Sequence, residues 1–158
     1  MHPSTRIALS ALISGTAASL ISTAALALLA RAEGKGAIQP TNATSHWFHG
    51  DSAAGHAEAD IAHTAVGYGT HHASALFWAF PFHVWLASQP PRSGLELLRD
   101  ASVMSAIAAT VDYGVVPRRL SPGWELVLSR KSMLVTYGAV ALGLAGGALV
   151  ARELLGDD

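Results

Sequence analysis

Histidines are the residues of this chain whose type and spacing could do chemistry. His63, His71, His72 and His83 lie within residues 61–91, where there is no Asp, Glu, Lys or Arg. Polar and ionisable groups inside such a segment are costly in a membrane and are often functional. Their spacing leaves two interpretations open, a binding site or hydrogen bonds that only pack a helical bundle.

A metal site is the first chemical interpretation, because imidazole together with carboxylate suits zinc, iron or manganese. The predicted ligands are His46, His49, His63 and Asp112. The predicted auxiliary residues are His56, Glu58, Asp60, Arg118 and Arg119. The pair His46-x-x-His49 would place two imidazoles on one side of a helical turn. HExxH, HxxEH and HxxHH are all absent, so no known metalloenzyme class is indicated and no catalytic residue is assigned.

Depth in the membrane is the reason for including Asp112 in that set. Asp112 lies four residues before Val116, where the segment that contains it is expected to end. His63 lies three residues beyond Asp60, about 4.5 Å deeper at 1.5 Å per residue. Asp112 and His63 are therefore expected at nearly the same depth, at one face of the bundle. Ion pairing of Asp112 to the arginines that follow it and a proton-relay role both remain open.

The intramembrane histidines form a deeper set. His72 and His83 are eleven residues apart, about 16 Å along a helix, which is too far to share one ion. Haem is less favoured than a divalent metal, because the other predicted spans contain no histidine for a second axial ligand. The alternative is hydrogen bonding to serine and threonine of the first span. Those hydroxyls are Ser10, Ser14, Ser19, Ser22 and Thr23.

Long apolar helices are the elements that must position these groups. Hydrophobic residues make up 51% of the chain and charged residues 13%, against about 25% in ordinary soluble domains. A span needs roughly 20 apolar residues. We therefore predict an all-α polytopic membrane protein of one domain, residues 1–158, with four transmembrane helices in a bundle. The predicted spans are residues 7–30, 61–87, 95–116 and 133–151.

Two loops connect the predicted spans at the same end. The histidine-rich loop, residues 31–60, is expected to carry a short amphipathic or re-entrant segment at the membrane surface, with Trp47 and Phe48 at the interface. The second loop, residues 117–132, is basic. Residues 7–30 are longer than the apolar core of a secretory signal, so we expect a retained helix, with a cleaved signal as the alternative.

Small-residue stripes predict close helix packing. Ala11, Gly15, Ser19 and Thr23 recur every four residues, and Ala139, Gly143 and Gly147 do the same. The lipid bilayer is the expected partner, with other proteins or further copies of this chain as possible partners of these faces. A net charge of −1 gives no indication of nucleic-acid binding, and the absence of cysteine excludes disulfides and thiol catalysis.

Three segments carry a resemblance to known proteins. TNATSHWFHGDSA at 41–53, HTAVGYGTHHASALFWA at 63–79 and VDYGVVPRRLSPGWE at 111–125 resemble an uncharacterised group of small multi-helix bacterial inner-membrane proteins. The resemblance implies a helical protein of the inner membrane and assigns no activity or functional residues.

Three functions remain as hypotheses. The leading one is a non-enzymatic accessory or structural membrane protein, or a subunit of a larger complex, because no specific catalytic motif is present. The second is a metal-dependent membrane enzyme or metal carrier that uses the predicted ligands. The third is a small proton- or solute-conducting unit that uses Asp112 and the histidines of residues 61–87.

Overall fold

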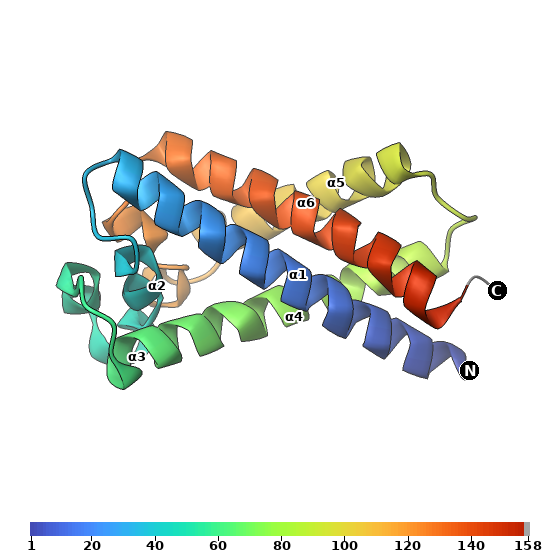
Figure 1. Cartoon of the computed structure of the whole chain (residues 1–158), viewed down its shortest axis with the longest axis horizontal. Helices are drawn as coiled ribbons and strands as arrows, with labels where there is room; N and C mark the ends of the chain where they lie inside the picture. The colour runs from blue at the N-terminus through green and yellow to red at the C-terminus, as the bar shows by residue number, and fades with distance from the viewer. Residues whose placement is uncertain (157–158) are drawn as a thin grey trace.

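Four long helices run back and forth along one axis in the computed structural model, which describes residues 1–156. They are α1 (Pro3–Ala32), α4 (Val66–Ala87), α5 (Gly94–Gly114) and α6 (Arg130–Leu155). Both ends of the chain lie at one end of the molecule, and short helices gather at the other (Figure 1). The all-α prediction is confirmed. Residues 157–158 of the predicted single domain lie outside the described residues.

The long helices begin and end within a few residues of the predicted ranges. Two of them, α1 and α6, are long and apolar enough to cross a membrane. Among the described residues α4 and α5 do not pass the same test of length and hydropathy. The reason is visible in their sequences, since α4 carries His, Ser and Thr and α5 carries Glu, Arg and Asp.

The α1–α6 seam is built from very small residues. A Cβ added at Gly143 would collide with the backbone of Ala18, and one added at Gly147 would collide with that of Ser14. These helices therefore approach so closely that only glycine fits on the α6 side. The predicted stripe of α6 is used for contact within the chain.

The α1–α4 seam uses the other predicted stripe. A Cβ on Gly15 would lie 2.9 Å from the Cα of Leu76. Ala11, Gly15 and Ser19 are all buried. Because α1 contacts α6 on one side and α4 on another, it is the central helix of the bundle, while α5 packs against α6.

The short elements form a cap over one end of the bundle. It comprises α2 (Gln39–Thr44), α3 (His46–His49), η1 (Asp51–Gly55), the single π-helical turn η2 (Ile61–Ala65), η3 (Arg118–Leu120) and η4 (Trp124–Leu126). The sequence predicts a short amphipathic or re-entrant segment in this loop, and α2 is not exposed as an amphipathic surface helix would be, since Pro40 to Thr44 are all buried. It inserts into the bundle end, where Gly67 allows the Thr41 carbonyl to approach α4 and Gly123, at φ +83°, faces the Ala43 carbonyl.

Hydrogen bonds from one buried amide organise the cap. Asn42 is fully buried, and its Nδ2 donates to the carbonyls of His56 (3.0 Å) and Glu58 (2.8 Å). Its Oδ1 accepts from the Thr64 hydroxyl at 2.7 Å. An amide buried without these partners would be costly. Asn42 therefore fixes the histidine-bearing loop relative to the start of α4.

Candidate functional site

The site begins at the turn that leads into α4. Asp60 is the N-cap residue of η2, with an extended backbone, and its Oδ1 accepts a hydrogen bond from the backbone N–H of His63 at 2.6 Å. A capping aspartate is favoured at such a position. This N-capping hydrogen bond directs the Asp60 carboxylate toward the side chain of His63.

Two imidazoles meet this carboxylate. Nδ1 of His63 lies 3.0 Å from Asp60 Oδ2, and Nε2 of His56 lies 3.5 Å from the same oxygen. The His56 and His63 rings stack, with centroids 3.8 Å apart. The ligand atoms of these residues all lie within 4.8 Å of one another. Within residues 1–156 these are the three His, Asp or Glu side chains whose possible ligand atoms lie this close together. We call them the His–Asp–His cluster.

These separations can be compared with those of a metal coordination shell. Zinc lies about 2.0–2.2 Å from nitrogen and oxygen ligands, so tetrahedral ligand atoms lie about 3.3–3.6 Å apart. The His56–Asp60 separation of 3.5 Å falls in this range, whereas the His63–Asp60 separation of 3.0 Å is that of a hydrogen bond, which an ion would replace. The side chains are accessible, with 48% of His56 and 38% of Asp60 exposed.

The Asp60 carboxylate is stabilised in its charged form. The backbone hydrogen bond from His63 lowers the pKa of Asp60 first, and the His63 side chain lowers it further. A carboxylate that stays ionised is the form that binds a cation. The cluster thus presents one negative oxygen between two nitrogen ligands.

His49 lies beside the cluster. Its ring centroid is 4.8 Å from that of His63, and its Nε2 is 3.0 Å from the Ala62 carbonyl oxygen. His49 is therefore a neighbour of the cluster, but its Nε2 already contacts a backbone carbonyl oxygen. Glu58, another predicted auxiliary residue, contributes its carbonyl oxygen to Asn42 and has an exposed side chain.

The other two predicted ligands have different partners. His46 is buried, and its Nε2 lies 2.9 Å from the carbonyl oxygen of Ser121, while Nδ1 lies 3.6 Å from Asp51. The carboxylate of Asp112 accepts a hydrogen bond from the Tyr137 hydroxyl at 2.6 Å. The structure therefore gathers His63 with His49, and places His46 and Asp112 in separate hydrogen-bonded pairs.

The two arginines after α5 contact the cap. Arg118 lies 3.3 Å from Asp51, and Arg119 donates to the Trp47 carbonyl oxygen at 3.3 Å. Within the described residues neither forms an ion pair with Asp112. Their role in the structure is to fasten the second loop to α3 and η1.

Two histidines of α4 form the serine hydrogen bonds that the sequence allows. His71 Nε2 lies 2.8 Å from the Ser22 hydroxyl, and His83 Nε2 lies 2.7 Å from the Ser14 hydroxyl. Both histidines are buried. They join α4 to α1 at two levels of the bundle. His72 instead stacks on Tyr68, with centroids 5.8 Å apart.

His71 and Asp112 both line a partly enclosed cavity beneath the cap. Its volume is about 50 Å³, and it lies between α4, α5, α6 and the cap. Three tryptophans and one tyrosine contribute to its lining: Trp47, Trp78, Trp124 and Tyr137. Sequence reasoning missed both this aromatic group and the partnership of Tyr137 with Asp112, since neither follows from spacing along the chain.

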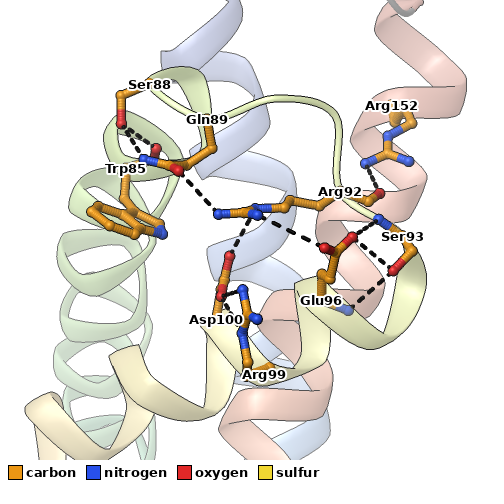
Figure 2. A network of polar contacts seen from close by, with 9 residues as sticks. All are labelled: Trp85, Ser88, Gln89, Arg92, Ser93, Glu96, Arg99, Asp100 and Arg152. Carbon is orange, nitrogen blue, oxygen red and sulfur yellow. Dashed lines mark hydrogen bonds and ion pairs between the residues drawn. The ribbon is translucent and has the colours of Figure 1, made fainter.

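At the opposite end of the bundle a polar network holds the α4–α5 turn against α5 and α6 (Figure 2). Arg92 lies 3.2 Å from Asp100, and Arg99 donates to the same carboxylate at 2.9 and 3.0 Å. Arg152 donates to the Arg92 carbonyl oxygen at 2.9 Å. The buried carboxylate is thus paired with two arginines, and the network ties the α4–α5 turn to α5 and α6.

Comparison with known proteins adds no relative. No family model, curated protein or solved structure matches the chain. The site is therefore defined by the geometry of this chain alone.

Proposed function

We propose that the chain is an integral membrane protein, with all four long helices embedded, and that its cap binds a divalent transition-metal ion. The distribution of side chains supports the membrane part. Large apolar side chains point outward on every long helix, for example Leu28, Phe77, Val103 and Leu134. Serine, alanine and glycine fill the interior, as is typical of helices packed in lipid. The resemblance to inner-membrane proteins favours the bacterial inner membrane.

The observation that carries the metal proposal is the convergence of His56, Asp60 and His63 on one point. Two imidazoles and one carboxylate suit zinc, iron(II) or manganese(II) rather than calcium or magnesium, which prefer all-oxygen shells. Three protein ligands leave a coordination position for water or for a further ligand. His49, whose ring centroid is 4.8 Å from that of His63, would join the shell only by giving up its contact with the Ala62 carbonyl oxygen.

The role we infer is that of a metal-binding accessory protein or complex subunit. The sequence carries no specific catalytic motif, and the neighbours of the cluster are His49, Ala62 and the exposed Glu58. Both small-residue stripes are used for contact within the chain, so a protein partner or further copy would pack on the outward faces of the helices. Those faces are broad and apolar, which suits lateral association in the bilayer.

The test is metal binding by tag-free protein in detergent. Zinc titrated by calorimetry is expected to bind with a stoichiometry of one, and His63→Ala is expected to weaken it by more than the 10- to 100-fold that loss of an outer-shell partner costs. His2→Ala is the matched control, because His2 is exposed and lies at the opposite end of the bundle.

A second variant separates ligation from folding. Asp60→Asn keeps a side chain that can cap η2, so the turn is expected to persist while the anionic ligand is lost. Unchanged zinc affinity in both His63→Ala and Asp60→Asn would overturn the proposal. Equal weakening by His2→Ala would show that binding is spread over surface histidines.

A further inference from the structure

The cavity beneath the cap has no role in the metal proposal, and its chemistry is different. Four aromatic rings and the His71 imidazole line it together with aliphatic side chains and one carboxylate, that of Asp112. The Trp124 and Tyr137 rings lie 5.6 Å apart, and His71 meets Trp124 edge-on at 5.4 Å. The rings therefore form a continuous wall, which a ligand in the cavity would contact.

Asp112 gives this wall a negative charge without an internal counter-ion. Its recorded contact within residues 1–156 is the hydrogen bond from Tyr137. The nearest loop arginines are used elsewhere, Arg118 on Asp51 and Arg119 on the Trp47 carbonyl. A half-buried carboxylate in an apolar cavity is stabilised by a cation that reaches it.

A second carboxylate adds to this charge. Glu125 follows Trp124 in the chain and accepts a hydrogen bond from the Ser121 hydroxyl. Its Oε2 is buried and has no hydrogen-bond partner in the part of the chain that the structure describes. Glu125 does not line the cavity, but its negative charge acts on Asp112.

We infer that the cavity binds a small organic cation, a methylated or primary ammonium group. Aromatic rings with a carboxylate are the surroundings in which proteins hold quaternary ammonium groups, through cation–π attraction within about 6 Å of the ring centroids. A metal ion is not favoured here, because the lining offers one carboxylate and otherwise mostly carbon.

The size of the cavity agrees with such a group. One water needs about 10–15 Å³ on the same measure, so 50 Å³ holds about four water-sized groups. A trimethylammonium head has a comparable number of non-hydrogen atoms. The remainder of the ligand would extend toward the open side.

The probe is choline, compared with its uncharged isostere 3,3-dimethyl-1-butanol, in calorimetric titrations of detergent-purified protein. Choline is expected to bind about tenfold or more tightly than the isostere, because only the cation gains from the rings and from Asp112. Equal binding of the two would show an apolar pocket for a lipid chain or other neutral occupant. No detectable binding of choline or tetramethylammonium would also overturn the inference.

Variants then assign the binding to this cavity. Asp112→Asn keeps an acceptor for the Tyr137 hydroxyl and removes the charge, and it is expected to lower choline affinity about tenfold or more. Glu96→Gln is the matched control, since it neutralises an exposed carboxylate on the same helix and can keep the capping box. Choline affinity unchanged in Asp112→Asn would contradict the inference. Binding that persists after chelation of metal would show that the two sites are independent.

Discussion

Two adjacent glycines of α6 offer a sharp test of the bundle. A Cβ at Gly147 would collide with the Cα of Ser14, whereas nothing lies within 4 Å of a Cβ at Gly146. Replacing a glycine by alanine in a helix interior stabilises the helix by about 0.5–1 kcal/mol. Gly146→Ala is therefore expected to raise the free energy of unfolding by that amount.

Gly147→Ala gains the same helix propensity, but the new methyl group must displace α1. Inserting a methylene into a filled core costs about 1–3 kcal/mol. Because the propensity gain is common to both variants, their difference isolates this cost. We expect Gly147→Ala to be less stable than Gly146→Ala by about 1–3 kcal/mol.

The assay is reversible unfolding in mixed micelles, followed by circular dichroism as the denaturing detergent increases. Gly138→Ala is a further control, since its surroundings are also open. Equal midpoints for Gly146→Ala and Gly147→Ala would show that α1 and α6 do not cross at Ser14, and the packing argument would fail.

Three further outcomes are expected. Hydrogen bonds from Ser129 lower the pKa of Glu33 in the folded protein. The ionised Glu33 should therefore stabilise the fold fully above the unfolded-state pKa of about 4.3, and this stabilisation should be lost as the pH falls through the folded-state pKa. Glu33→Gln should thus melt below wild type at neutral pH, with a gap that closes in acid; a pH-independent gap would contradict this. Ser14→Ala, which removes the partner of His83, should cost about 0.6–1.7 kcal/mol in the same unfolding assay, and no loss would show that the bond is not formed. Asn42→Ala, which breaks three hydrogen bonds worth about 1 kcal/mol each, should speed proteolysis between residues 50 and 60; unchanged cleavage would refute its role in the cap.

The long helices could be predicted because the residues next to their ends determine where they stop. The turn-forming run from Ser88 to Ser93 separates α4 from α5, since helices end where such signals occur. Gln39-Pro40 instead begins α2, with Pro40 in its first turn. The spacing of small residues indicated close packing for the same reason. The four transmembrane crossings remain a proposal, since length and hydropathy single out α1 and α6.

The cap could not be predicted in the same way. Asn42 reads as a polar loop residue, yet it is fully buried because carbonyls 14 and 16 residues later accept its hydrogen bonds. Such partners depend on how the loop folds back, which no local pattern encodes. Of the two predicted forms, the exposed amphipathic one is therefore not adopted by α2, and the re-entrant one stays a prediction.

The candidate site was predictable in part. Asp60 and His63 meet because Asp60 caps the turn that contains His63, which the i, i+3 spacing allows. His56 reaches Asp60 from a non-helical loop, so the i, i+4 spacing alone does not predict this contact. The depth argument instead paired His63 with Asp112, although Asp112 binds Tyr137 on α6. Helix register around the bundle decides such pairs, and depth alone does not give the register.

The most direct measurement of the central claim is the X-ray absorption spectrum of zinc-loaded protein in detergent. The metal proposal predicts nitrogen and oxygen ligands at about 2.0–2.2 Å, with outer-shell scattering from two imidazole rings, or three if His49 joins. In His56→Ala/His63→Ala that imidazole scattering should disappear. A spectrum of oxygen ligands alone, or one unchanged in the double variant, would contradict a metal site at the His–Asp–His cluster.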